Sequence, residues 1–84
     1  MSKLSSHIYA GDADLQAMIV LAQELRSQGQ VVYPIAADLY EELSETEVQA
    51  TARLWANEHQ QLVGFAYVSQ YQNLVDVVDI RELT

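Results

Sequence analysis

The stretch RLWANEHQQLVGFAYVSQYQNLVDVVDI, Arg53 to Ile80, decides the fold. Its apolar residues fall into three short runs separated by polar segments, which is typical of an antiparallel meander. We predict three strands, over residues 52–58, 62–70 and 73–80. The first two strands form a hairpin around His59-Gln60-Gln61, and the third returns after Tyr71-Gln72.

Both faces of this predicted meander are apolar. In a simple antiparallel register, one face collects Trp55, Val63, Phe65, Tyr67, Val75 and Val77. The other face collects Leu54, Ala56, Leu62, Ala66, Val68, Leu74, Val78 and Ile80. A sheet with one face in water shows clean alternation of apolar and polar residues, so this pattern predicts cover on both faces.

Upstream, the chain predicts a short strand and a long helix. Residues 6–10 (SHIYA) form the strand, and Gly11-Asp12 follows as a turn whose aspartate can cap the next element. Apolar residues then recur at helical spacing, and Gly29 stands where a left-handed helix end is expected. These apolar residues are Leu15, Met18, Ile19, Ala22 and Leu25.

A second, shorter helix follows Pro34, which can start a helix but cannot continue one. Ile35, Leu39 and Leu43 repeat every four residues and place its end near Leu43. The segment SETE, residues 44–47, has the spacing of a capping box and predicts one further helical turn. The order β-α-α-β-β-β is an α+β fold: one domain over residues 1–84, with the meander packed against two N-terminal helices.

Composition narrows the classes of protein. Half of the 84 residues are apolar, so the chain is expected to fold, and it has no cysteine for disulfides or thiolate metal sites. Twelve acidic residues against four basic ones give a net charge of −8. This charge repels nucleic acid and suits a cationic amine, although an acidic surface also serves solubility alone. No apolar run approaches membrane-spanning length and the start MSKLSSHIYA lacks the apolar stretch of a signal peptide, so we predict a cytoplasmic protein.

The sequence does not contain a complete pattern of a common catalytic or metal-binding site. His7 and His59 have no second ligand at metal spacing, and the calcium-loop match that begins at Asp12 breaks at the next positions. The hydroxyls of Ser44, Thr51 and Ser69 lack a paired base, so we expect them to hydrogen-bond locally. No catalytic residue and no metal ligand is predicted.

The chain resembles the N-terminal half of the GNAT superfamily of N-acetyltransferases. The segments that carry the resemblance are RLWANEHQQLVGFAYV at 53–68, YP at 33–34, LSETEV at 43–48 and NLVDVVD at 73–79. The resemblance covers nearly all of this chain but about half of a GNAT domain. It implies that Val77, Val78, Asp79 and Ile80 lie beside the acetyl-CoA arm. It also implies that Tyr33 and Tyr67 lie near an acceptor pocket, where aromatic packing is the alternative role.

The sequence departs from the family after the last strand. GNAT enzymes bind the cofactor pyrophosphate with a glycine-containing loop that opens a helix, whereas here RELT follows and no glycine occurs after Gly64. We therefore expect the isolated chain to be catalytically inactive, and acetyl-CoA to bind only if a missing C-terminal half completes the site. The alternative function is a small acidic protein–protein interaction module.

The second apolar face of the meander also predicts an assembly. Two helices can cover one face only, and the other would be left in water together with an unpaired strand edge. We predict that two copies cover each other as an obligate homodimer. The predicted interface consists of Leu62, Ala66, Val68, Leu74 and Val78.

Overall fold

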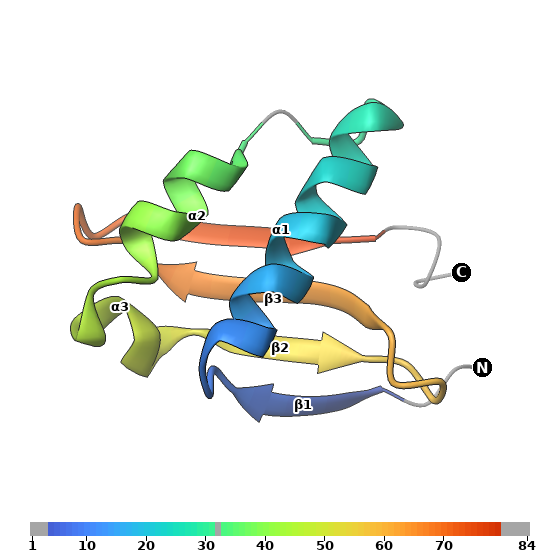
Figure 1. Ribbon diagram of the computed structural model, residues 1–84, viewed down its shortest axis with the longest axis horizontal. Helices are drawn as coiled ribbons and strands as arrows, with labels where there is room; N and C mark the ends of the chain where they lie inside the picture. Colours follow the sequence, from blue (N-terminus) through green and yellow to red (C-terminus); the bar gives the residue numbers. More distant parts are fainter. Residues whose placement is uncertain (1–3, 32, 80–84) are drawn as a thin grey trace.

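A layer of helices covers one side of a four-stranded antiparallel sheet (Figure 1). The computed structural model describes residues 4–31 and 33–79. In chain order the elements are β1 (Ser5–Ile8), α1 (Asp12–Ser27), α2 (Ala36–Glu42), α3 (Thr46–Thr51), β2 (Arg53–Ala56), β3 (Leu62–Val68) and β4 (Leu74–Val78). The strands lie in the order β1-β2-β3-β4, and each pairs antiparallel with its neighbours. The predicted α+β fold and its meander are confirmed, with α3 as the further helical turn.

The two ends of α1 are fixed by different devices. At its end, Gly29 has a φ of 74°, the N–H of Gln30 donates to the carbonyl of Leu25 (2.9 Å), and Gly29 donates to Arg26 (3.0 Å). These bonds form a Schellman motif, so the predicted helix end is confirmed. At its start, Asp14 accepts from the backbone N–H of Ala10 at 2.8 Å, whereas no side chain caps the helix from Gly11. The predicted cap by Asp12 is therefore wrong.

The short helices α2 and α3 follow each other closely. Asp38 accepts a hydrogen bond from the backbone N–H of Ile35 at 3.0 Å, which fixes the first turn of α2. The predicted capping box at Ser44 and Glu47 is wrong, because Ser44 donates instead to the carbonyl of Glu41 (2.6 Å) and α3 has no side-chain cap. A hydroxyl that bonds back to the preceding turn is not free to cap the next helix.

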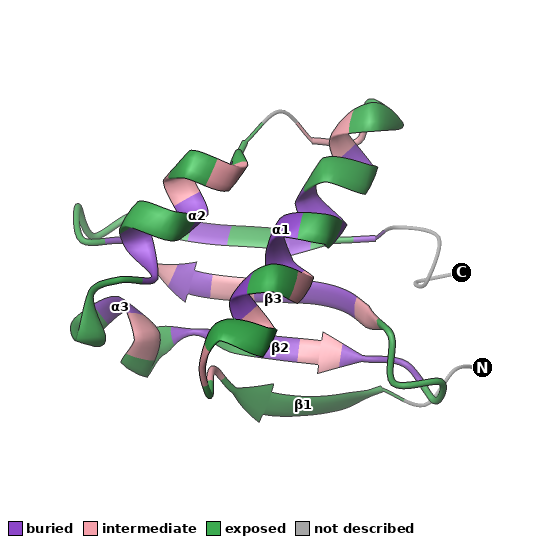
Figure 2. Ribbon diagram, viewed as in Figure 1, coloured by how far each residue is buried: buried purple, intermediate pink, exposed green. Residues whose placement is uncertain are grey.

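The core lies between the helices and one face of the sheet, where Figure 2 shows buried residues on the inner side of α1 and on β3. Phe65, Tyr67, Val75 and Val77 lie on this face, as predicted. Leu54 stands directly opposite Phe65 and is fully buried, whereas Trp55 stands opposite Gly64. The prediction that Trp55 shares a face with Phe65 and that Leu54 lies on the other face is wrong.

A β-bulge explains this error. The register moves from Trp55 opposite Gly64 to Ala56 opposite Leu62, so Val63 has no directly paired residue on β2. One extra residue reverses which side chains share a face, and this cannot be seen in an alternation pattern. Leu62 consequently packs against the core beside α1 and does not lie with Ala66 and Val68 on the opposite face.

The opposite side of the sheet, here called the open face, is not covered by any helix of the described residues (Figure 1). By strand alternation and register it carries Ser6, Ile8, Arg53, Trp55, Gly64, Ala66, Val68, Leu74, Asp76 and Val78. Ile8 and Leu74 are 56% and 70% exposed. The expectation of a second apolar face is thus met by the described strands.

Candidate ligand-binding site

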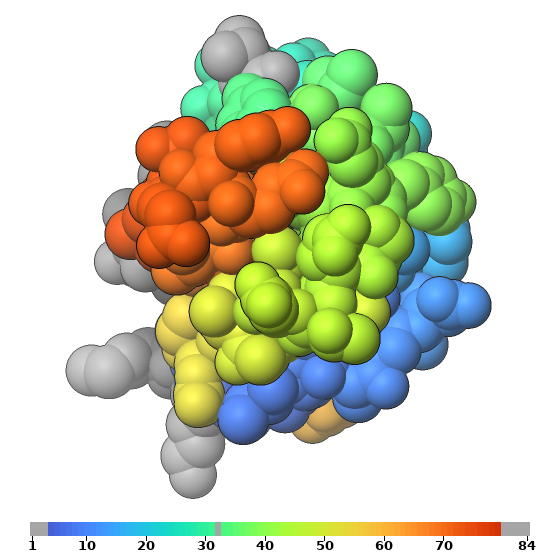
Figure 3. All heavy atoms as spheres, turned by 90° about the vertical axis from the view of Figure 1, so that its left-hand side faces the viewer, coloured from blue at the N-terminus to red at the C-terminus, as the bar shows by residue number. Residues whose placement is uncertain are grey.

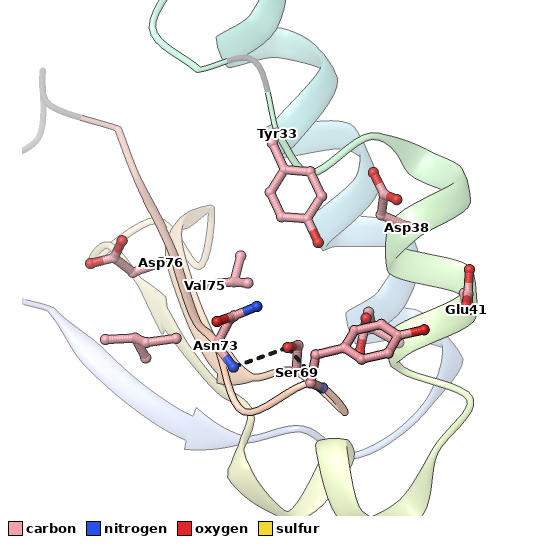
Figure 4. A pocket seen from close by; sticks show the side chains of 10 residues that line it. Tyr33, Asp38, Glu41, Ser69, Asn73, Val75 and Asp76 are labelled. Carbon is pink, nitrogen blue, oxygen red and sulfur yellow. Dashed lines mark hydrogen bonds between the residues drawn. The ribbon is translucent and has the colours of Figure 1, made fainter.

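A cavity of about 470 Å³ opens between α2, the β3–β4 turn and β4 (Figure 4). Figure 3 views this end of the molecule, where the turn and β4 (orange) lie against α2 (green). The residues that line the cavity are Tyr33, Asp38, Glu41, Glu42, Ser69, Tyr71, Asn73, Leu74, Val75 and Asp76. Four of them are carboxylates and none is lysine or arginine, so the cavity attracts positive charge.

One face of α2 supplies three of the four carboxylates. Asp38, Glu41 and Glu42 stand at positions i, i+3 and i+4, which lie on one side of a helix. Asp76 comes from β4 and lies on the far side of that strand from Tyr33 in Figure 4, at the rim of the cavity. The negative charge is therefore concentrated on the helical wall.

The carboxylates also hold the turn that forms the opposite wall. Glu42 is 5% exposed and accepts a hydrogen bond from the backbone N–H of Gln70 at 3.0 Å. Ser69 accepts hydrogen bonds from the backbone N–H groups of Tyr71 and Asn73, each at 3.2 Å. These bonds fix the conformation of the β3–β4 turn and tie it to α2.

A buried tyrosine hydroxyl lies beside this cavity. Tyr67 is 1% exposed, and its hydroxyl makes no hydrogen bond of ordinary length among the described residues, although the Tyr33 hydroxyl is close enough to interact with it. Burial raises the pKa of Tyr67 above its usual range, and the nearby Tyr33 hydroxyl and Glu42 carboxylate raise it further. The groups that act on Tyr67 thus line the cavity, whereas Tyr67 itself lies behind the cavity wall.

Tyr33 forms part of the wall on the loop before α2. Its ring is half exposed, and its hydroxyl points into the cavity (Figure 4). Partial burial and then the carboxylate of Asp38 raise the pKa of the Tyr33 phenol, so Tyr33 stays neutral near pH 7. A neutral phenol ring beside carboxylates can bind a cation through its π-face and through its oxygen.

Two of the sequence-predicted site residues meet here. Tyr33 and Tyr67, predicted from the resemblance to lie near an acceptor pocket, interact electrostatically with each other. The predicted cofactor residues are dispersed: Val77 is buried in the core, Val78 lies on the open face, and Asp79 is buried. Ile80 lies outside the described residues.

The geometry of β4 limits which backbone groups can meet a ligand. Val63 accepts a hydrogen bond from Asp79 and Asn73 accepts one from Ser69, so odd-numbered residues of β4 bond to β3. The backbone groups of Asp76 and Val78 point to the outer edge, which pairs with no strand in residues 4–31 and 33–79. Asp76 is exposed whereas Asp79 is buried, because side chains three residues apart on an extended chain point to opposite faces of the sheet.

The acidic wall was missed from the sequence. Its signal is the spacing of Asp38, Glu41 and Glu42, which places three carboxylates on one helix face. The contribution of Ser69 and Tyr71 could not have been seen, because it depends on where the β3–β4 turn meets α2.

The remaining hydroxyls and histidines are occupied or dispersed. Thr51 donates to the carbonyl of Val48 (2.8 Å) and accepts from the N–H of Val68 (2.9 Å), so local bonding of Thr51, Ser44 and Ser69 is confirmed. His7 contacts Asp14 at 3.0 Å and His59 lies 3.8 Å from Glu58. In the part of the chain that the structure describes, no three histidine, cysteine or carboxylate side chains are arranged so that they could hold a metal ion.

No described helix is both long and apolar enough to cross a membrane. Comparison of the chain with protein-family models, with curated proteins and with solved structures finds no match.

Proposed function

We propose that the chain is a GNAT-like half domain that binds a cationic amine in the cavity between α2 and β4 and transfers no acetyl group by itself. One observation carries the amine part: three carboxylates of one helix face and a half-exposed tyrosine line one cavity, and no described lysine or arginine lines it. The family part is supported by the resemblance of the segments around LVGFA, at 62–66, to acetyltransferases of this superfamily.

The cavity chemistry fits a small alkylammonium. An ammonium group donates three hydrogen bonds, for which Asp38 and Glu41 offer acceptors and the Tyr33 ring a π-face. The Tyr67 hydroxyl lies behind this wall and interacts with the Tyr33 hydroxyl. Anions are disfavoured, because no lysine or arginine lines the cavity to pair with them.

Titration calorimetry with 1,4-diaminobutane tests the amine part. Wild type is compared with the double variant Asp38→Asn, Glu41→Gln, and with the control variant Glu45→Gln, Glu47→Gln, which removes the same charge from exposed positions around the start of α3. We expect the cavity variant to weaken binding about tenfold or more and the control to change it less than about twofold. Butane-1,4-diol, which has the same length and no charge, should not bind. Equal weakening in both variants would show attraction to the overall charge only.

The acetyl-transfer part predicts catalytic silence for this 84-residue chain. The resemblance places acetyl-CoA beside β4, where Asp76 and the cavity carboxylates oppose an anionic pyrophosphate. We expect no coenzyme A release from acetyl-CoA with or without 1,4-diaminobutane, measured with a thiol reagent. Saturable coenzyme A release by the purified chain that is lost in the Asp38→Asn, Glu41→Gln variant would contradict the proposal.

A further inference from the structure

The charge and the shape of the open face are self-complementary. Arg53 on β2 and Asp76 on β4 both stand opposite Ala66 of β3, so the three residues form one row across the sheet. In the next row, Trp55 and Val78 both stand opposite Gly64. Each row thus has a small residue in the centre and larger, complementary residues on either side.

The row centres form a hollow. An apolar depression of about 270 Å³ lies on this face, lined by Trp55, Gly64, Ala66, Val78 and neighbouring residues. A Cβ added at Gly64 would approach the Val77 carbonyl oxygen to 3.1 Å, so the floor at this point is closely packed. The small residues of β3 make the floor, and β2 and β4 make the walls.

The charged groups of these walls are available. Asp76 is exposed and has no hydrogen-bond or ion-pair partner among residues 4–31 and 33–79. Arg53 is exposed and donates one hydrogen bond, of 3.2 Å, to the hydroxyl of Ser6 on the same face. The Asp76 carboxylate and the Arg53 guanidinium stand two strands apart with Ala66 between them. Each can therefore pair with an oppositely charged group of a molecule that packs on this face.

We propose that the open face binds a second copy of this chain, related by a two-fold axis that runs along β3. Such an axis places β2 of one copy over β4 of the other. Arg53 of each copy then faces Asp76 of its partner, and Trp55 faces Val78 of the partner. Both contacts occur twice, as a closed two-fold interface requires.

The dimensions allow this packing. Stacked sheets lie about 10 Å apart and adjacent strands about 4.8 Å apart, so the partner's Trp55 needs to lean toward the axis by less than one strand spacing to reach the hollow above Gly64. The rotation of about 30° between stacked sheets moves residues one strand from the axis by about 2–3 Å, which a long arginine side chain spans. The partner's indole fills the hollow, and the charges fix the register.

Of the five residues predicted from the sequence for a dimer interface, four lie on this face: Ala66, Val68, Leu74 and Val78. Leu62 packs toward α1 and takes no part. The helix-side core is packed within one chain, so dissociation of this dimer need not unfold the monomer.

Charge reversal tests the inference. In a homodimer, the variant Asp76→Arg places two guanidinium groups against each other at both contacts, and the variant Arg53→Asp places two carboxylates against each other at both contacts. We expect each variant to weaken dimerisation about tenfold or more in sedimentation velocity runs over a range of concentrations, because two attractive contacts become repulsive. In an equimolar mixture of the two variants, one chain supplies only guanidinium groups and the other only carboxylates. Both contacts of a heterodimer are therefore attractive arginine–aspartate pairs. This heterodimer should form about as tightly as the wild-type dimer.

The controls separate this geometry from other causes. Glu47→Arg on α3 changes the net charge as Asp76→Arg does and should leave the dimer intact. Both reversed positions are exposed, and the circular dichroism of each variant should match that of wild type. A monomeric wild type at about 0.5 mM, or a mixture that stays monomeric while the wild type dimerises, would overturn the proposal. The diamine experiment leaves Asp76 unchanged, so the two proposals can fail separately.

Discussion

At the scale of single residues, Tyr67 connects stability to the proposed binding. Its ring stacks on Phe65 with the ring centroids 6.4 Å apart, and its fully buried hydroxyl makes no hydrogen bond of ordinary length among the described residues. Leaving a buried hydroxyl unsatisfied costs about 1–3 kcal/mol of folding free energy. A group that costs stability beside a cavity is expected where a ligand makes use of it.

Tyr67→Phe should therefore raise stability and weaken binding together. We expect the free energy of unfolding, from urea titration, to rise by about 1 kcal/mol because the unsatisfied hydroxyl is removed and the stacked ring is kept. Diamine affinity should fall in the same variant. Tyr40→Phe is the matched control, because the exposed Tyr40 hydroxyl accepts a bond from Gln16 at 3.1 Å, away from the cavity. A loss of stability in Tyr67→Phe would show that the hydroxyl is satisfied in solution.

Alkaline pH provides a second measurement on the same residue. Burial raises the pKa of Tyr67 above the value of about 10 that it has in the unfolded chain, so the folded state keeps its proton longer. The neutral form contributes stability that is fully present below about pH 10 and is lost as the pH rises through the folded-state pKa. Urea unfolding of the wild type should show a decrease above about pH 10 that is smaller in Tyr67→Phe. Equal decreases would assign the effect to other tyrosines.

At the scale of elements, the bulge between β2 and β3 assigns the aromatic residues to different layers. Phe65 is fully buried under the helices, whereas Trp55 lies on the open face and is only half-buried. Trp55 and Phe65 are not cross-strand partners, and they lie on opposite faces of the sheet. The same element therefore contributes one aromatic to the core and one to a surface.

Truncation of the two aromatics should have unequal effects. Phe65→Ala should cost about 3–5 kcal/mol, enough to unfold a domain of this size, because it leaves a cavity in the core. Trp55→Ala should cost the monomer clearly less than Phe65→Ala does, because Trp55 lies on the open face and is only partly buried. Thermal unfolding monitored by far-UV circular dichroism at low protein concentration compares them. Equal losses would place Trp55 in the core and contradict the observed register.

The limits of prediction from sequence follow from these elements. Periodicity and Gly29 located α1, and the turn residues located the meander, because these signals are local. The bulge depends on how two strands meet, so the faces of Leu54, Trp55 and Leu62 could not be derived from alternation. The cavity depends on the contact between Glu42 and the β3–β4 turn, which lies 28 residues away in the chain.

At the scale of the whole molecule, the distribution of charge gives the cavity its character. The chain carries a net charge of −8. Of the basic residues that the structure describes, Arg26 donates to the Pro34 carbonyl at 2.6 Å and Arg53 lies on the open face. Neither lines the cavity, so its carboxylates are not neutralised from within the walls. The net negative charge thus attracts cations to the molecule, and the carboxylates at the cavity can accept hydrogen bonds from them.

The central claim, that one cavity rather than the general acidic surface takes the amine, is tested most directly by NMR. Amide chemical shifts are recorded on ¹⁵N-labelled protein during titration with 1,4-diaminobutane at about 0.15 M salt, which screens exposed charges beyond about 8 Å. We expect saturating shifts confined to α2, Tyr33 and the segment from Ser69 to Asp76. Shifts of the same size at Glu45, Glu47 and Glu58, without saturation, would contradict the account.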